Sequence, residues 1–437
     1  MTLRSVGSGV WSKDRNTELV LLAGSAAFVL VAWRALDKAA FTMPAGSSRI
    51  LTQFLLSALL GHCGLRIVAP RASGQLYAIV LLLTAIGLAF VLRLNPAVAQ
   101  TQANWISVGI ACMVATALAC RRYPSLRRYK YTAALATVLL LVATGIFGTT
   151  INGARLWFRI GGQTVQTTEF VKLFFIVFLA AYLADSGGVL SAPRMRFGGK
   201  TYTALPYIIP LALALGASIM VIGLLHDLGT IALLLLLVMG ALYVATGRLS
   251  YVVGGVALLV ATVLAGYVMF DHVRVRVDVW IDPGAHAQTT GYQTLQSIYA
   301  IQAGGVTGEG LGLGDPDAIP VVSTDYIFSA ISEELGLAGG LGVVLLYLLL
   351  LSAGLRIALA TQEDFGRMLA CCISLLLAIQ AAVIIGGNLR IIPTTGITLP
   401  FISYGGSSLV VNFVLIGMLL GISQRSMGAR SGDARNR

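Results

Sequence analysis

The stretch GYQTLQSIYAIQAGGVTGEGLGLGDPDAIPVVSTDYIFSAISEELGLAGGLG, residues 291–342, joins a polar, glycine-rich loop to an apolar run of membrane-spanning length. Asp325 stands where the loop gives way to the apolar run, and Glu333 and Glu334 follow about two turns later. Carboxylates at the rim or inside of a spanning helix are costly, and by default they mark a functional site. We therefore expect the rest of the chain to hold this segment over a cavity at one membrane face.

The composition places the chain in a membrane. Of its 437 residues, 57% are hydrophobic and only 11% are charged, and the mean hydropathy is +0.85. A soluble domain carries roughly 25% charged residues, so the composition indicates a polytopic membrane protein. The net charge of +12 does not predict nucleic-acid binding, because the basic residues stand in short clusters between apolar runs, which is typical of cytoplasmic loops.

The five cysteines fall in or beside apolar segments and show no metal-ligand spacing. We expect them to be small buried hydrophobic side chains rather than metal ligands: Cys63, Cys112, Cys120, Cys371 and Cys372. The first apolar run starts near residue 18 and is long enough to span a membrane, so it does not read as a cleavable signal peptide.

The hydropathy pattern predicts an all-α polytopic membrane protein with about twelve transmembrane helices. The expected spans lie near residues 18–36, 50–69, 76–94, 104–120, 131–150, 169–184, 205–225, 228–246, 250–270, 326–352, 368–388 and 404–423.

The charges in the loops predict the orientation. If the N-terminus is cytoplasmic, the inside loops include RRYPSLRRYK at 121–130, with five basic residues and no acid. The opposite loops are poorer in Lys and Arg, so we expect both termini to be cytoplasmic and the large loop 271–325 to be extracellular. We expect a tail and an extra hairpin over 1–70, a core over 71–424 and a cytoplasmic tail over 425–437, with short flexible ends.

Asp325 has two interpretations. It precedes a long helix in VVSTDYIF, where an N-cap is the structural explanation. The functional explanation is a carboxylate beside a cavity that takes a proton from a hydroxyl group. A helix N-terminus would make it a weaker base. The spacing alone leaves both open.

Three other segments are polar at a membrane face. The stretch 151–168 leads into Glu169 and Lys172, which share a helical face and can pair. In RVRVDVWIDP, Arg274 and Arg276 alternate with apolar residues, which fits either an exposed strand-like ribbon or an interfacial element that meets phosphate. In 391–408 the prolines and glycines forbid a continuous helix, which fits an ordinary turn or, as the Thr, Ser and Tyr content favours, a cavity wall.

Together these motifs resemble those of the SEDS family (shape, elongation, division and sporulation), the group of RodA, FtsW and SpoVE. The resemblance covers most of the chain, from about residue 76 to 424. It rests on NGARLWF and QTTEFVKL (152–158 and 166–173), HDLGT (226–230), RVDVWIDP (276–283), GYQTLQSIYAI (291–301), STDYIFSAISEELG (323–336) and IIPTTGITLPFISYGGSS (391–408).

The resemblance implies a ten-helix core, preceded here by two extra helices. It also implies a peptidoglycan glycosyltransferase that polymerises lipid II at the outer face of the bacterial cytoplasmic membrane, with a class B penicillin-binding protein as partner. Asp325 matches the essential carboxylate. Cations, or a divalent ion such as Mg²⁺ or Mn²⁺, would stabilise the undecaprenyl pyrophosphate leaving group. The expected substrate-binding residues are Lys172, Glu169, Arg155, Trp157, Arg159, Arg276, Ser403 and Tyr404.

The chain departs from the family pattern at several positions. Val321 and Ser323 replace an acidic residue and a histidine before the aspartate, Leu156 replaces an arginine, Thr167 a proline, Glu309 a lysine and Arg390 a glycine. None of these removes Asp325, Glu169 or Lys172. Two rival functions stay open, a lipid II flippase and a non-catalytic scaffold for the transpeptidase. The charges collect at one face rather than along a transbilayer path, which disfavours the flippase.

Overall fold

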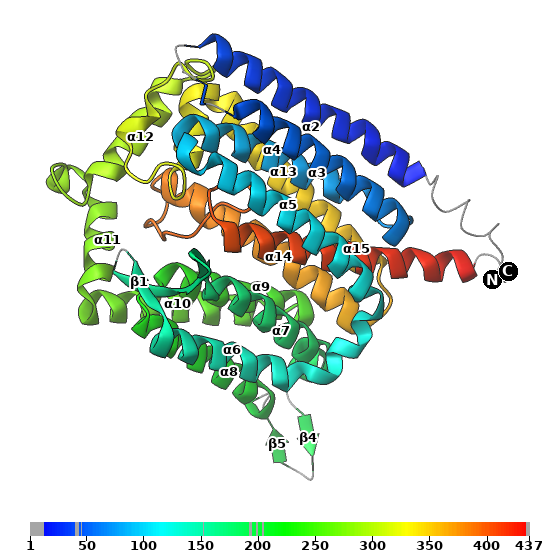
Figure 1. The fold of residues 1–437 in the computed structure, drawn as a ribbon. Coiled ribbons are helices and arrows are strands. Elements are labelled where there is room, and N and C mark those ends of the chain that lie inside the picture. The colour runs from blue at the N-terminus through cyan, green and yellow to red at the C-terminus, as the bar shows by residue number, and fades with distance from the viewer. Residues whose placement is uncertain are drawn as a thin grey trace. The chain divides into compact units, whose positions relative to one another are not determined.

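The computed structural model describes residues 13–39, 43–44, 46–151, 153–191, 195–197, 200–202 and 205–433 (Figure 1). The protein is about 80% helical, which confirms the expected helical architecture. Within the described residues, eleven stretches are long and apolar enough to cross a membrane. The protein is therefore a multi-pass membrane protein.

One of the eleven stretches, Pro96–Phe147, holds two of the expected spans. Helix α5 (Pro96–Ala119) continues into the 3₁₀ helix η1 (Cys120–Tyr129) and then into α6 (Lys130–Phe147). The basic segment between the spans was expected to be a loop. Its backbone instead stays helical in a tighter form, with Pro124 inside and a kink at Arg122.

The chain forms two compact units. Unit 1 comprises residues 1–121, 275–356 and 380–437. In it, α2 (Lys13–Lys38) packs against α4 (Gly74–Leu94), α3 (Ser47–Val68) against α5, and α5 against α15 (Gly406–Asp433) (Figure 1). Helix α4 is buried on nearly every side, as its uniformly apolar sequence predicts. The N-terminal pair α2–α3 thus packs on α4 and α5, while the expected boundary at residue 70 stays a prediction.

Unit 2 comprises residues 122–274 and 357–379. Its helices include α6, α7 (Thr167–Ser191), α8 (Leu205–Leu224), α9 (Leu228–Thr246) and α10 (Leu249–Met269). Helix α7 packs against α6 and α9, and α9 against α10 (Figure 1). Asp227 caps α9 by accepting hydrogen bonds from the Thr230 N–H at 3.0 Å and the Thr230 hydroxyl at 2.7 Å.

Unit 2 also holds strands that an all-α expectation missed. Strands β1 (Thr149–Ile151), β2 (Ala154–Ile160) and β3 (Gln163–Gln166) form an antiparallel sheet in that order, and β4 (Met195–Phe197) pairs with β5 (Lys200–Tyr202). The β2–β3 turn consists of Gly161 and Gly162, both at positive φ, with Ile160 opposite Gln163. Two positive-φ residues between strands favour a tight hairpin. This glycine pair between alternating apolar residues was the missed signal.

The segment 271–325, expected as one large loop, contains helices. They are α11 (Asp271–Ile281), η2 (Gly284–His286), α12 (Tyr292–Gly304) and η3 (Pro316–Ala318). The strand-like interpretation of RVRVDVWIDP is therefore wrong. A ribbon without a pairing strand would leave its backbone groups unbonded, whereas a helix satisfies them internally.

Helix α13 (Ile327–Ala360) is broken at Gly336, which has φ 66° and ψ −167°. The backbone N–H groups of Glu309 and Gly310 donate to the carbonyls of Glu333 and Glu334, at 3.0 and 2.9 Å. The glycine-rich loop therefore satisfies carbonyl groups that the break releases.

Helix α14 (Asp364–Asn388) is followed by the irregular segment that begins with Leu389 and ends at α15. The expected flexible C-terminal end is helical as far as Asp433. Residues 1–12 and 434–437, for which flexible ends were also predicted, lie outside the described residues.

Candidate active site

Asp325 lies immediately before helix α13 but does not cap it. The first helical hydrogen bonds, from the N–H groups of Ser329 and Ala330, go to the carbonyl oxygen of Tyr326 at 3.0 and 3.3 Å. Tyr326 is thus the N-cap position. In the described part of the chain, no first-turn N–H of α13 donates to the Asp325 carboxylate. The carboxylate is therefore available for chemistry.

The backbone on both sides of Asp325 is tied to neighbouring segments. The Asn388 amide donates to the Asp325 carbonyl at 2.8 Å and to the Ile384 carbonyl at 3.1 Å. The Ser403 hydroxyl donates to the Thr324 carbonyl at 2.5 Å, and the Tyr404 N–H donates to the Ser323 carbonyl at 2.9 Å. These bonds fix the direction in which the Asp325 side chain leaves the chain.

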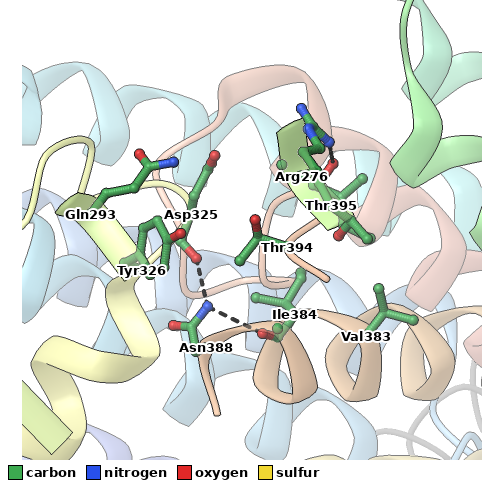
Figure 2. Close-up of a pocket in the computed structure, with 12 residues that line it drawn as sticks. Arg276, Gln293, Asp325, Tyr326, Val383, Ile384, Asn388, Thr394 and Thr395 are labelled. Atoms are coloured by element: carbon green, nitrogen blue, oxygen red, sulfur yellow. Dashed lines mark hydrogen bonds between the residues drawn. The ribbon is translucent and has the colours of Figure 1, made fainter. Parts of the chain in front are cut away.

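A pocket opens at this carboxylate (Figure 2). Its empty space, including the open solvent at its mouth, is about 460 Å³. Helix α11, helix α12, the two residues before α13, the end of α14 and the segment after it all contribute. The lining residues are Arg276, Gln293, Asp325, Tyr326, Val383, Ile384, Gly387, Asn388, Thr394, Thr395, Gly396 and Ile397. The expectation that 391–408 contributes a cavity wall is confirmed for residues 394–397.

Arg276 faces this pocket from α11 (Figure 2). Its guanidinium donates to the Thr395 carbonyl at 3.0 Å. Gly396, at φ 71°, follows directly: a Cβ there would lie 3.7 Å from Asp325 Oδ2 and 3.6 Å from a guanidinium nitrogen of Arg276. These are ordinary contact distances, so the positive φ of residue 396 is what favours glycine there.

Burial raises the pKa of Asp325 above its ordinary value. A hydrogen bond from Thr324 and the positive charge of Arg276 lower the pKa, but they do not cancel the effect of burial. A carboxylate with a raised pKa is a stronger base than an ordinary aspartate. The effect of burial on the pKa of Asp325 is thus opposite to the effect expected from a helix N-terminus.

A second group of expected residues belongs to unit 2. Glu169 and Lys172 lie in the first turns of α7, and their charged groups are 2.6 Å apart. Both side chains are buried, with 4% and 2% of their surface exposed. The pair is therefore a buried ion pair rather than the exposed helical pair that spacing alone suggests.

Arg155, Trp157 and Arg159 alternate along β2, so their side chains share one face of the sheet. Arg155 and Arg159 are exposed, whereas Leu156 between them is buried. The Arg155 guanidinium donates to the Gly145 carbonyl at 3.0 Å. The structure thus groups these three residues on one strand of unit 2, and Asp325 with Arg276 in unit 1.

Glu333 and Glu334 hold the glycine-rich loop and do not line the Asp325 pocket. Glu333 accepts from the Asp315 N–H at 2.8 Å, and Glu334 accepts from the Gly312 N–H at 2.9 Å and from Arg93 at 3.2 Å. Their position inside a span suggested a functional site. The contacts give them a structural role.

The donor set at the pocket does not fit a protein-held metal ion. In the part of the chain that the structure describes, no group of three or more His, Cys, Asp or Glu side chains could hold one. Asp325 is the one carboxylate among the residues that line the pocket. The divalent cation expected from the sequence stays a prediction.

Sequence reasoning missed Gln293 and Asn388 as members of the site. Gln293 lay inside a quoted motif, and Asn388 is a lone amide at the end of an apolar run, which could have been noticed. Ser403, expected to bind substrate, is buried and uses its hydroxyl on backbone groups at Thr324 and Leu399. Substrate binding by Ser403 and Tyr404 stays a prediction, while their contacts position Asp325.

The model of the family described as cell cycle protein, FtsW/RodA/SpoVE, matches residues 71–427 of this chain. The chain belongs to the FtsW/RodA/SpoVE family. The match starts at residue 71, after α2 and α3.

Three relatives show how similar the chain is to known proteins, two of them over more than nine tenths of its length. The chain is 36% identical to the peptidoglycan glycosyltransferase RodA of Mycobacterium tuberculosis over 95% of this chain and 91% of that protein. It is 37% identical to the RodA of Mycobacterium leprae, over 94% and 90%. It is 34% identical to the stage V sporulation protein E of Bacillus subtilis, over 66% and 76%.

Solved structures of family members share the fold. One structure, of a peptidoglycan synthase complex that coordinates polymerization and crosslinking, matches with a TM-score of 0.66 and 27% identity. The match covers 81% of this chain and 98% of that chain. The rod shape-determining protein RodA of Thermus thermophilus matches with a TM-score of 0.58 and 25% identity, over 80% and 96%.

Proposed function

We propose that the protein is a peptidoglycan glycosyltransferase that polymerises lipid II into glycan strands, with Asp325 as its general base. The observation that carries the assignment to this site is the Asp325 carboxylate, uncommitted to helix capping, in a pocket that Arg276 also lines. The relatives support the reaction class, because the RodA proteins 36% and 37% identical to this chain are named peptidoglycan glycosyltransferases.

The reaction joins an acceptor hydroxyl to an anomeric carbon. As the 4-hydroxyl oxygen of the acceptor GlcNAc attacks the anomeric carbon of the growing chain, its proton passes to the Asp325 carboxylate. The bond between the anomeric carbon and the phosphate oxygen breaks, and undecaprenyl pyrophosphate leaves with the bonding electrons. A positioned general base contributes roughly 10²–10⁴-fold to rate.

The leaving pyrophosphate gains negative charge and needs cations. Arg276 is the strongest candidate, because it is the one cationic side chain among the residues that line the Asp325 pocket. Lys172 is a weaker candidate than the sequence suggested, since Glu169 lies 2.6 Å from its ammonium group. Arg155 and Arg159 are exposed on β2 and can meet a phosphate at the membrane surface.

A penicillin-binding protein is the partner that the comparisons support, because a structural neighbour is a synthase complex that coordinates polymerization and crosslinking. We infer that the partner is of class B. We also infer that the site lies at the outer face of the bacterial cytoplasmic membrane, with both termini in the cytoplasm. The basic segment 121–130 supports this orientation.

Purified protein given labelled lipid II, with and without a cognate transpeptidase, tests the proposal. Glycan ladders are the expected result. Transbilayer movement of lipid II without polymer would instead identify a flippase, and neither activity would identify a scaffold.

A further inference from the structure

Arg390 connects the segment after α14 to the end of α11. Its Nε donates to the Trp280 carbonyl at 2.9 Å, and a terminal guanidinium nitrogen donates to the Ile281 carbonyl at 2.6 Å. In return, the Trp280 indole N–H donates to the Arg390 carbonyl at 3.2 Å. The carbonyls at a helix C-terminus have no partner within the helix and attract cations. Arg390 therefore binds the C-terminal end of α11 with a charged, two-pronged contact.

The backbone at Arg390 is unfavourable for an arginine. Its φ is 57°, in the left-handed region that favours glycine. Its N–H donates to the Gly387 carbonyl at 3.1 Å, within the turn that ends α14. A glycine would adopt this turn without strain. The arginine is thus held there against a conformational cost, and what it adds over glycine is the contact with α11.

The turn that carries Arg390 also carries the supports of the active site. Asn388, two residues earlier, holds the Asp325 carbonyl, and Thr395, five residues later, accepts from Arg276. Arg276 lies on α11 one helical turn before Trp280. The segment 388–396 therefore contacts Asp325, Arg276 and helix α11, which carries Arg276.

We propose that Arg390 is a positioning residue that holds the end of α11 on the segment 388–396 and so keeps Arg276 at the pocket across from Asp325. The inference rests on the proposed function, in which Asp325 accepts the proton. Arg390 does not line the pocket, so it acts through Arg276.

The test is the pH dependence of kcat/KM for lipid II polymerisation by the full-length protein. The ionisable groups that line the pocket are Arg276, Asp325 and Tyr326. Because the Arg276 charge lowers the pKa of Asp325, Arg390→Gly should move the acid limb to higher pH and reduce kcat/KM by about 3- to 10-fold. Arg276→Gln should move the limb in the same direction. The double variant should move it no further than Arg276→Gln alone.

Arg274→Gln is the matched control, because it removes an arginine from the same helix that makes an ion pair with Asp271 at 3.6 Å, at the exposed start of α11. It should leave the pH profile unchanged. An Arg390→Gly profile identical to wild type, or a shift that adds fully to that of Arg276→Gln, would overturn the inference.

Hydrogen exchange separates this inference from the proposed function. Arg390→Gly should speed amide exchange over 278–282 whether or not Asp325 is the base. Unchanged exchange in these residues would also overturn the proposal that Arg390 holds the end of α11. If Asp325→Asn keeps wild-type activity while exchange rises in Arg390→Gly, Asp325 is not the general base, but the contact between Arg390 and α11 is supported. Glycine suits the turn at residue 390, so the variant should fold, and Arg390→Lys should give an intermediate exchange rate.

Discussion

Asp325 is partly buried, and this burial raises the pKa of its carboxyl group above the ordinary value. Its raised pKa means that the carboxylate form, which accepts the proton, disappears as pH falls through a value above the ordinary 3.8. We expect kcat/KM to drop on this acid side, and Arg276→Gln to move the drop to higher pH, since a charge that lowers the pKa is gone. Rates measured across pH test this. A limb that moves to lower pH in Arg276→Gln would contradict the electrostatics.

The role of the ion pair between Glu169 and Lys172 is tested with a single and a double variant, because both side chains are buried. Lys172→Met alone leaves the Glu169 carboxylate buried without that cation and should destabilise the protein by about 3–5 kcal/mol. The double variant Glu169→Gln, Lys172→Met should recover most of that stability. Thermal unfolding in detergent measures both.

Activity of the double variant then decides the role of Lys172. If the cation acts on the pyrophosphate, the stable double variant should still lose most polymerase activity, and Lys172→Arg should keep some. A stable double variant with wild-type activity would reject this role.

The break in α13 is an element whose sequence requirement is strict. Gly336 has φ 66° and ψ −167°, and a Cβ there would lie 2.3 Å from the Gly308 backbone nitrogen. Gly336→Ala should cost at least about 1–3 kcal/mol, because only glycine adopts this backbone conformation without strain. Gly342→Ala is the control within the same helix, since its Cβ would meet nothing within 4 Å. Equal melting temperatures for the two variants would contradict this reading of the break.

The elements differ in how far sequence could predict them. Most spans follow from hydropathy, because a twenty-residue apolar run has few alternatives to a membrane helix. Helix α11 was ambiguous, since its alternating Val and Arg residues fit a strand as well as a helix in a short polar segment. The β1–β3 sheet was missed although Gly161-Gly162 marked its turn, because β1 and β3 have only three and four residues and leave little periodic signal.

The orientation of the protein in the membrane stays a prediction. Ala285 is exposed in the short helix between α11 and α12. A single cysteine at this position in an otherwise cysteine-free protein should react with an impermeant maleimide in intact spheroplasts. Labelling only after lysis would put the segment on the cytoplasmic side.

The site itself shows what sequence could and could not supply. Asp325 was predictable because its chemistry, its place before a span and the family resemblance agree on one residue. Its partners were not, since Arg276 and Thr395 are 119 residues apart and Asn388 is 63 residues from Asp325. Arg390 was visible as a departure from the family pattern, but its contact with α11, 110 residues away, required the structure.

Replacing Asp325 with asparagine shows whether this carboxylate is the general base. Asparagine keeps the shape of the side chain but cannot accept the proton at neutral pH, and the Asn388 bond to the backbone carbonyl is unaffected. The measurement is polymerisation of labelled lipid II by variant and wild type at equal membrane abundance and equal thermal stability. We expect a folded variant that makes no glycan chains, because the loss of a general base lowers the rate by roughly 10²–10⁴-fold. A folded Asp325→Asn protein that polymerises lipid II at near wild-type rate would contradict it.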